Sequence, residues 1–248
     1  MSRELEGRVA LVTGAAGGMG TAIAIALSRL GVAVAVNDRD SAMLTPVLGA
    51  LGERSVAVAA DVTKKPEVEA MVTSVEQQLG PIDILVNNAG VLRPTKVVDI
   101  DEAEWDFVVD VNLKGTFLCS QAVIPGMQTR GWGRIVNLSS TAGKNVSTIG
   151  GAHYTAAKAG VLGLTRHIAS EVAGHGVTVN AVCPGLIDTN MTRATITGAE
   201  ADAYAASFPI SRLGRPDEVA DLIAFLASER AGYITGASLD INGGDLMI

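Results

Sequence analysis

Tyr154 and Lys158 are the two residues whose types and spacing most directly suggest chemistry. They stand four residues apart in a stretch with a helical pattern, so both side chains should lie on one helix face. An ammonium beside a phenol favours the phenolate, and we therefore expect the pKa of Tyr154 to fall from about 10 towards the working pH. Such a tyrosine can exchange a proton with an alcohol or carbonyl oxygen. The pair also has a plain reading, a half-buried tyrosine beside a solvated lysine.

The elements that must position this pair are short apolar runs that alternate with amphipathic stretches. Runs that are apolar throughout are typical of parallel strands covered on both faces. We expect strands at 8–13, 32–37, 54–60, 82–86, 134–138, 177–182 and 238–241, and helices at 21–30, 41–51, 64–79, 101–127, 154–173 and 216–226. This order predicts an α/β fold: a doubly wound, Rossmann-like, mostly parallel seven-stranded sheet with helices on both faces, in a single domain over 1–248.

Composition and charge restrict the classes of partner. The chain has 248 residues, a formal net charge of −7 and no long basic run, so we expect neither nucleic acid nor a membrane as partner. Cys119 and Cys183 have no metal-binding spacing, so no metal site is expected. The uncharged stretch 9–28 is interrupted by glycines and should be strand, turn and helix rather than a membrane span. Without an apolar leader at the start, a cytoplasmic location is expected.

A glycine-rich turn, TGAAGGMG, joins the first expected strand to the first helix. Residues without a Cβ allow a tight turn and let the backbone approach a pyrophosphate, which the free N–H groups of a helix N-terminus also favour. The turn therefore predicts a dinucleotide site, although glycine turns also occur without a ligand. Its central residues are Gly14, Gly17, Gly18, Met19 and Gly20.

Asp38, at the end of the second expected strand, bears on which dinucleotide is bound. A carboxylate there accepts hydrogen bonds from the adenosine ribose and repels a 2′-phosphate, which favours NAD over NADP. Gly17 offers no basic side chain for a 2′-phosphate, but Arg39 could reach one. Asp61 and Val62 stand at the next strand end, where the adenine amino group would be recognised. Asp61 could equally be the N-cap of the following helix.

Several further motifs follow along the chain. They are NNAG at 87–90, Asn112, Ser140, Pro184-Gly185 and Asn242-Gly243-Gly244. Together with the glycine turn, Asp61-Val62 and the Tyr154–Lys158 pair, they make the chain resemble the classical short-chain dehydrogenase/reductase family over essentially its whole length. The resemblance implies an NAD(P)-dependent oxidoreductase with a Rossmann-like sheet, usually a homotetramer.

The resemblance also implies a catalytic tetrad of Asn112, Ser140, Tyr154 and Lys158. Tyr154 would be the general acid or base, and Lys158 would bind the nicotinamide ribose and lower the pKa of Tyr154. Ser140 would donate a hydrogen bond to the substrate oxygen, and Asn112 would hold a water that links Lys158 to solvent. We prefer Ser140 to Ser139 because its distance from Tyr154 fits the family, and because Ser139 should face the other way on a strand.

The cofactor site predicted in this way extends over several strand ends. Asn88 and Gly90 would line the adenosine half, while Ile187 and Thr189 would hold the nicotinamide carboxamide. NAD is the expected cofactor and NADP the alternative. The full set of expected cofactor-binding residues is Gly14, Gly17, Gly18, Met19, Gly20, Asp38, Arg39, Asp61, Val62, Asn88, Ala89, Gly90, Tyr154, Lys158, Pro184, Gly185, Ile187 and Thr189.

The substrate side is less determined by the residues. A lid is expected at about 188–215. Arg193 and Arg212 could bind a charged substrate, but solvated arginine is the plainer reading of each. His153 could lie at the pocket edge or on the surface. The pocket itself should be formed by the loop 142–152, His153, Leu186 and the segment 190–212.

These observations predict hydride transfer between NAD and a small-molecule secondary alcohol or ketone. The first alternative is a 3-oxoacyl-carrier-protein reductase, as relatives of this general sequence often are. Asp38 opposes the NADPH that those enzymes mostly use. For an acidic carrier, the turn 174–176 offers only His175, with Arg130 and Arg134 also available. The second alternative, an inactive NAD-binding regulatory module, is opposed by the presence of all four tetrad residues.

The hydropathy of the chain bears on its oligomeric state. A mean hydropathy of +0.33 is high for a monomer and suggests apolar surface hidden between subunits. By the family resemblance, the helices at 101–127 and 152–173 would form the interface of a homotetramer.

Overall fold

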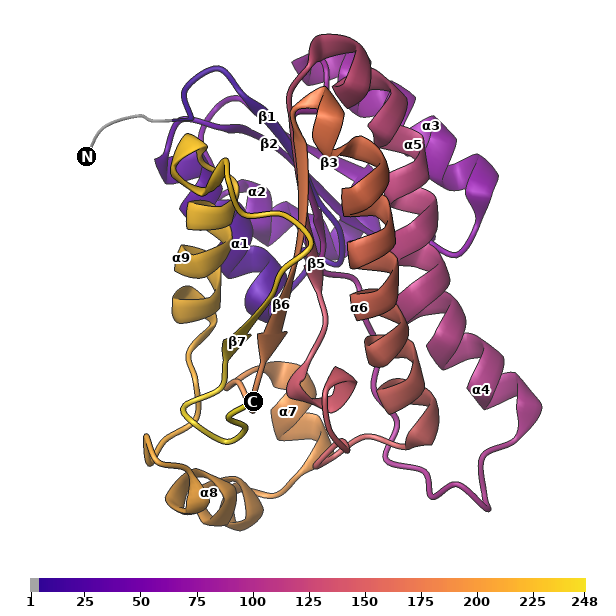
Figure 1. The fold of residues 1–248 in the computed structure, drawn as a ribbon, viewed down its shortest axis with the longest axis vertical. Coiled ribbons are helices and arrows are strands. Elements are labelled where there is room, and N and C mark those ends of the chain that lie inside the picture. The colour runs from indigo at the N-terminus through magenta and orange to yellow at the C-terminus, as the bar shows by residue number, and fades with distance from the viewer. Residues whose placement is uncertain (1–4) are drawn as a thin grey trace.

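One parallel sheet organises the chain in the computed structural model, which describes residues 5–248. Its seven strands follow the order β3-β2-β1-β4-β5-β6-β7, and all neighbouring strands are parallel (Figure 1). The predicted doubly wound α/β fold is confirmed, and the sheet is wholly rather than mostly parallel. The strand order reverses between β1 and β4, and ligands bind at this switch point in sheets of this kind.

The elements agree with most of the expected ranges. The strands are β1 (Val9–Val12), β2 (Ala33–Asp38), β3 (Ser55–Ala59), β4 (Ile84–Asn87), β5 (Gly133–Leu138), β6 (Val177–Pro184) and β7 (Ser238–Ile241). The helices are α1 (Gly18–Arg29), α2 (Thr45–Leu48), α3 (Lys65–Leu79), α4 (Glu102–Val109), α5 (Gly115–Arg130), α6 (Ala152–Val172), α7 (Asn190–Thr195), α8 (Gly198–Ser207) and α9 (Pro216–Leu226). The stretch 9–28 is β1, a turn and α1, as expected.

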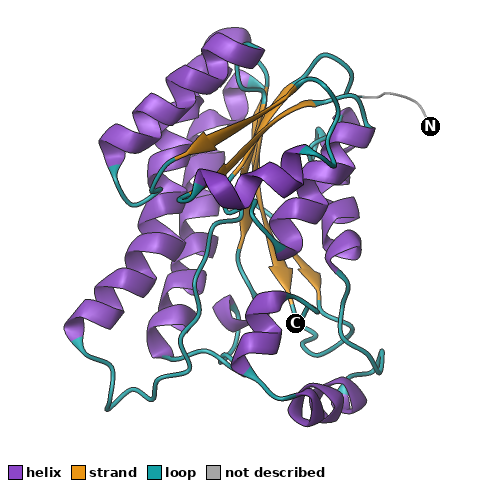
Figure 2. Cartoon of the chain, turned by 180° about the vertical axis from the view of Figure 1, so that it is seen from behind, coloured by secondary structure: helices purple, strands orange, loops and turns teal. Residues whose placement is uncertain are grey.

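Helices cover both faces of the sheet (Figures 1 and 2). α1 and α9 pack together on one face, and α3, α5 and α6 cover the other. Along β1, Ala10 and Val12 belong to the first core, whereas Val9 and Leu11 belong to the second. Because successive strand residues point to opposite faces, a strand buried on both sides must be apolar throughout.

Two expected elements differ from the structure. The stretch 41–51 is a 3₁₀ turn at Ser41–Leu44 followed by the short α2, not one helix. Pro46 has no N–H with which to continue the helical hydrogen bonds, and the chain leaves the helix at Gly49. The segment 188–215 is more regular than expected, because it contains α7 and α8.

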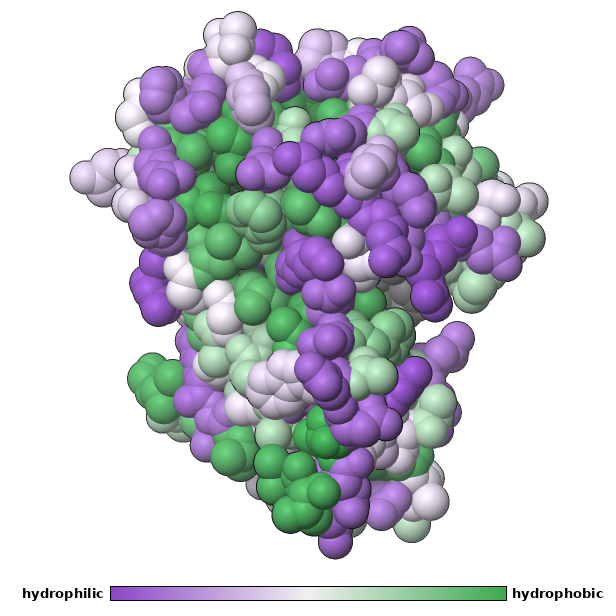
Figure 3. Space-filling model, turned by 90° about the vertical axis from the view of Figure 1, so that its right-hand side faces the viewer, coloured by the Kyte–Doolittle hydropathy of each residue, from purple (hydrophilic) through white to green (hydrophobic). Residues whose placement is uncertain are grey.

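The helix expected at 101–127 runs on to Arg130 and is interrupted by a π-helical turn at Asp110–Lys114, between α4 and α5. By length and composition alone, the stretch Glu102–Arg130 would suffice to cross a membrane. Its inner side is nevertheless part of the core beneath the sheet, as in the core helix of a globular domain. On the outer side of this layer, apolar atoms form a patch among polar ones (Figure 3).

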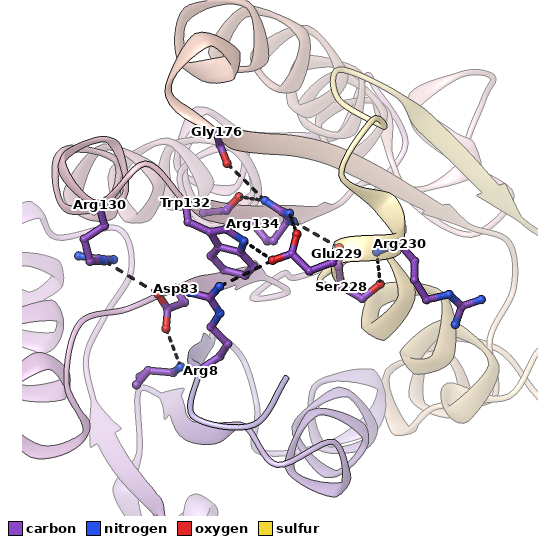
Figure 4. A network of polar contacts seen from close by, with 11 residues as sticks. Arg8, Asp83, Arg130, Trp132, Arg134, Gly176, Ser228, Glu229 and Arg230 are labelled. Atoms are coloured by element: carbon purple, nitrogen blue, oxygen red, sulfur yellow. Dashed lines mark hydrogen bonds and ion pairs between the residues drawn. The ribbon is translucent and has the colours of Figure 1, made fainter. Parts of the chain in front are cut away.

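A polar network closes the amino end of the sheet (Figure 4). The buried Arg134 donates hydrogen bonds to the carbonyl of Gly176, at 3.3 Å, and to the carboxylate of Glu229, also at 3.3 Å. Trp132 lies between two guanidinium groups, with Cζ of Arg8 at 3.6 Å and Cζ of Arg134 at 4.3 Å from its ring centroid. The network joins β1 and β5 to the segment before β7, on the end of the sheet opposite the candidate site.

Candidate active site

Hydrogen bonds join the carboxyl end of β1 to that of β4 across the switch point. The hydroxyl of Thr13 accepts hydrogen bonds from the backbone N–H groups of Asn88 and Ala89, both at 3.1 Å. Nδ2 of Asn88 donates to the carbonyl of Gly14 at 2.8 Å. Asn88 thus holds the glycine turn in place. Thr13, which was not expected among the site residues, performs the same task from the other side.

Ser140, Tyr154 and Lys158 come together at the ends of β5 and α6. The Ser140 side chain lies beside the Tyr154 phenol and acts on its pKa, and its hydroxyl accepts from the N–H of Ala142 at 3.1 Å. Nζ of Lys158 lies 5.6 Å from the Tyr154 ring centroid and donates to the carbonyl of Leu138 at 2.8 Å. Oγ of Ser139 donates instead to the backbone carbonyl of Lys158, at 2.8 Å. The two serines therefore serve different sides of the strand, as the alternation of strand residues predicts.

The proton affinity of Tyr154 differs from the expectation. Burial raises the pKa of the Tyr154 phenol, and the neighbouring Ser140 side chain opposes this rise only in part. Burial also lowers the pKa of Lys158 to about 8. The expected lowering of the Tyr154 pKa is therefore wrong. The phenol of Tyr154 and the ammonium of Lys158 are both shielded from water, and Lys158 donates to the Leu138 carbonyl rather than to Tyr154.

Asn112 lies in the π-helical turn and is completely buried. Its Nδ2 donates to the carbonyls of Val91 and Val108, both at 2.8 Å, while its Oδ1 has no hydrogen-bond partner within residues 5–248. A Cβ on Gly90 would lie 2.9 Å from this oxygen and 3.6 Å from Nζ of Lys158. Gly90 thus leaves the space between Asn112 and Lys158 open, and the free acceptor suits a bound water.

Comparisons with known proteins agree with this arrangement. The model of the family described as "Enoyl-(Acyl carrier protein) reductase" matches residues 14–245. Nodulation protein G of Azospirillum brasilense is 46% identical over 241 residues, which are 96% of this chain and 97% of that protein. The 3-oxoacyl-[acyl-carrier-protein] reductase FabG of Vibrio cholerae is 43% identical over 98% of this chain and 99% of its own. This chain belongs to the short-chain dehydrogenase/reductase family.

Solved structures of similar chains share the whole fold. The crystal structure of gox2181 has a TM-score of 0.94 at 40% sequence identity. That of a short-chain type dehydrogenase/reductase from Mycobacterium marinum has a TM-score of 0.92 at 34%. Each match covers 98% of this chain and 96% of the other. Membership of the family makes the protein an oxidoreductase with a nicotinamide cofactor.

The glycine turn of this dehydrogenase/reductase leaves room for such a cofactor. α1 begins at Gly18, and Gly17 before it provides no side-chain cap, so the first N–H groups of the helix remain free for a pyrophosphate. A Cβ on Gly17 would meet nothing within 4 Å, whereas one on Gly14 would lie 2.6 Å from Cα of Ala89. Across from the turn, Thr189 would lie 3.3 Å from a Cβ on Gly18. Thr189 thus closes over Gly18, while the free N–H groups of α1 and the pocket beside Gly14 fit a dinucleotide.

Asp38 and Arg39 border a pocket beside Gly14 that suits the adenosine half. Oδ2 of Asp38 accepts from the N–H of Ala16 at 3.3 Å, and Oδ1 accepts from the N–H of Arg39 at 2.8 Å. The carboxylate is thus held at the mouth of the glycine turn, while the Arg39 side chain is exposed. This placement fixes the Asp38 carboxylate beside the backbone of the turn, at the edge of the pocket.

Asp61 and Val62 line the same pocket. Oδ1 of Asp61 accepts from the N–H of Thr63 at 2.9 Å and from its hydroxyl at 2.8 Å. The residue that precedes α3 as its N-cap is Lys64, so the reading of Asp61 as that N-cap is wrong. Asp61 fixes the turn that follows β3, and this turn presents Val62 to the pocket.

The substrate pocket lies between Tyr154, the loop after β5 and the start of the lid. Its apolar wall includes Leu92, Ile149, Leu186 and Met191, and its polar wall carries hydroxyl groups. Asp245, which was not expected in the pocket, is the single charged residue that lines it. The Asp245 carboxylate has no hydrogen bond or ion pair to the described part of the chain. The sequence signal that could have indicated Asp245 is its place directly after the Asn242-Gly243-Gly244 motif.

The lid is fastened at its base. The N–H of Asp188 donates to the carbonyl of Gly214 at 2.9 Å, and the N–H of Gly214 donates to the carbonyl of Leu186 at 3.0 Å. The exposed Arg193 is bidentate to Asp188, at 2.6 and 2.7 Å, and Arg212 is bidentate to Glu218. Both arginines are therefore held by carboxylates and do not line the substrate pocket.

Two further expectations about basic residues need correction. His153 lies neither at the pocket edge nor on the surface, because its side chain is completely buried. Arg134 is not available to an acidic carrier, because it is buried in the network at the amino end of the sheet. Arg130 is partly exposed, but its Nη2 donates to the carbonyl of Ile82.

Proposed function

We propose that this protein reduces the 3-oxo group of an acyl thioester to a hydroxyl group, with Tyr154 as the proton donor. The observation that carries the proposal is that Ser140 and Tyr154 line one partly apolar pocket, in a chain whose full-length relatives include 3-oxoacyl-[acyl-carrier-protein] reductases. Burial raises the pKa of Tyr154, so the phenol keeps its proton at neutral pH, as a proton donor must. Relatives named 3-oxoacyl-[acyl-carrier-protein] reductases, 42–43% identical over nearly the whole chain, support the same class of substrate.

Each residue of the site would have one role in the reduction. The bound cofactor supplies the hydride. Ser140 donates a hydrogen bond to the carbonyl oxygen as negative charge develops there, and Tyr154 gives its proton to the same oxygen. The free Oδ1 of Asn112 would hold a water near Lys158, through which the site regains a proton from solvent. The apolar wall with Leu92 and Ile149 would receive the acyl chain.

A substrate panel tests the proposal. Rates are measured with NADH and with NADPH on 3-oxoacyl thioesters of carrier protein and of coenzyme A, and on simple ketones. We expect kcat/KM for at least one 3-oxoacyl thioester to exceed that for simple ketones by about 10-fold or more, because a matched acyl chain adds apolar burial at roughly 25 cal/mol per Å². Equal or higher kcat/KM for simple ketones contradicts the proposal.

A second candidate is NAD-linked interconversion of a small secondary alcohol and its ketone. Asp245 favours it, because a carboxylate without a partner at the pocket repels the phosphates of coenzyme A and of a carrier arm, and accepts hydrogen bonds from a hydroxylated substrate. The second candidate is also favoured because no lysine or arginine among residues 5–248 lines the pocket and Arg134 is bound to Glu229 in the network at the other end of the sheet. The same panel, run with secondary alcohols and NAD, decides between the two candidates.

We propose NAD rather than NADP as the preferred cofactor, on the basis of Asp38. In Asp38→Asn the charge that repels a 2′-phosphate is lost while the shape is kept, so the preference for NAD over NADP in kcat/KM should fall by about 10-fold. The control is Arg39→Ala, which should leave the preference unchanged. A wild-type protein that prefers NADP, together with a loss of NADP use in Arg39→Ala, would assign the phosphate to Arg39 instead.

We also propose a homotetramer in a reducing, cytoplasmic setting. Trp105 on α4 and Phe117 on α5 are 41% and 42% exposed, within the layer whose outer side shows the apolar patch of Figure 3. Two buried free cysteines, Cys119 and Cys183, suit a compartment without disulfide formation. Sedimentation should give about four times the 25.4 kDa of one chain, and a mass near one chain would contradict the tetramer.

A further inference from the structure

His153 precedes the tyrosine of the site and is enclosed on all sides. Its side chain has 0% exposure. Nε2 lies 2.9 Å from Oε1 of Glu104 on α4, and Nδ1 lies 2.9 Å from the backbone nitrogen of Tyr154. The Trp105 ring lies beside it, with 6.5 Å between the ring centroids. Both ring nitrogens are therefore engaged, one with each helix.

These contacts determine where the imidazole proton lies. The backbone N–H of Tyr154 can only donate, so Nδ1 must be the unprotonated acceptor. The proton is then on Nε2, which donates to Glu104. Thr95, His153 and the charge of Arg93 all favour the ionised carboxylate of Glu104, and its pKa is lowered accordingly.

His153 gives the start of α6 a side-chain acceptor that its N-cap residue lacks. Gly151 is the N-cap residue, and glycine has no side chain with which to accept one of the free N–H groups of the first turn. The N–H of Tyr154 reaches the Gly151 carbonyl at 3.1 Å and the His153 ring at 2.9 Å. A Cβ at position 151 would lie 2.5 Å from the Thr95 carbonyl oxygen and 2.8 Å from Cε1 of His153, so glycine is needed here both by the loop before α4 and by the ring. His153 thus replaces the missing side-chain cap.

We propose that His153 and Glu104 are positioning residues that fix the first turn of α6 and thereby set Tyr154 against Ser140. Neither residue lines the substrate pocket, so both act through the backbone of Tyr154. The loop before α4 adds to the support, because the N–H of Gly151 donates to the Arg93 carbonyl at 2.7 Å. The charged groups around the imidazole are Glu104 and, beyond it, Arg93.

The two contacts of His153 can be separated by matched substitutions. An asparagine places its Oδ1 near the position of Nδ1, so His153→Asn keeps the acceptor for the Tyr154 N–H and loses Glu104. A glutamine places its Nε2 near the position of the imidazole Nε2, so His153→Gln keeps Glu104 and loses the acceptor. His153→Leu loses both contacts. Glu104→Gln keeps a neutral acceptor for the imidazole.

The first readout needs no substrate. The chain has three tyrosines, and Tyr204 and Tyr233 lie outside the site, so a Tyr204→Phe/Tyr233→Phe background leaves Tyr154 as the single phenol. Its pKa is followed by phenolate absorbance. We expect this pKa to stay as in the parent in His153→Asn and Glu104→Gln, and to fall towards the ordinary value of about 10 in His153→Gln and His153→Leu, where the phenol becomes better solvated.

The second readout is turnover of the best substrate from the panel. We expect kcat to fall by about 10-fold in His153→Gln and His153→Leu, because a displacement of about 1 Å at a reacting group can cost up to 10²-fold. His153→Asn should stay within about 3-fold, and the Kd of NAD should not change in any variant. If all variants lose thermal stability while the Tyr154 pKa and kcat remain those of the parent, the pair is merely structural and the proposal is overturned.

Discussion

Replacing Tyr154 with phenylalanine should lower kcat/KM by about 10²- to 10⁴-fold, the usual contribution of a positioned proton donor. The substitution removes only the hydroxyl group. The ring remains available to pack beside Nζ of Lys158, so the Kd of NAD, measured by titration calorimetry, should stay within about 3-fold of the wild-type value. A protein that binds NAD and shows less than a 10-fold loss of activity would exclude Tyr154 as the acid.

The pH dependence of the wild-type rates should differ between reduction and oxidation. Reduction requires the phenol, and burial raises the pKa of Tyr154, so the rate should be level through neutral pH and fall only in the alkaline range. Oxidation requires the phenolate, so its rate should rise with pH. Both dependences should vanish in Tyr154→Phe. A wild-type protein that binds NAD but turns over no compound of the panel would support the inactive regulatory module.

Replacing Ser140 with alanine should lower kcat by about 10²- to 10³-fold, the usual effect of losing one donor to a developing oxyanion. Binding of the ground-state substrate changes less, so KM should move by a few-fold at most. Rates measured at saturating cofactor separate kcat from KM.

Ser139→Ala is the matched control for Ser140. Oγ of Ser139 donates to the Lys158 carbonyl and not to Tyr154, so its loss should cost about 1 kcal/mol of stability and leave kcat within a few-fold. Thermal unfolding records the first effect and steady-state kinetics the second. If the Ser139 variant were the inactive one, the roles of the two serines would have to be exchanged.

The outline of the fold could be predicted because its signals are local. Strands such as β1 are apolar at every position, since Val9 and Val12 each serve a core on one side of the sheet. The glycine turn could be predicted from the run TGAAGGMG alone. The structure explains why glycine stands at position 14, because its φ is +60° and a Cβ would have no room. The prediction of a single helix at 41–51 was wrong, because Pro46 and Gly49 limit α2 to Thr45–Leu48.

The sequence by itself determined the order of the strands, the glycine turn after β1 and, through the family resemblance, the residue types expected around Tyr154. Only the tertiary structure decided how those residues behave. The pKa of Tyr154 rises because the fold removes water from it, which no spacing in the chain records. His153 meets Glu104, 49 positions away, and Asp245 reaches the pocket from the far end of the chain. Burial and contacts between distant segments exist only once the chain has folded, whereas periodicity and turn chemistry are properties of neighbouring residues.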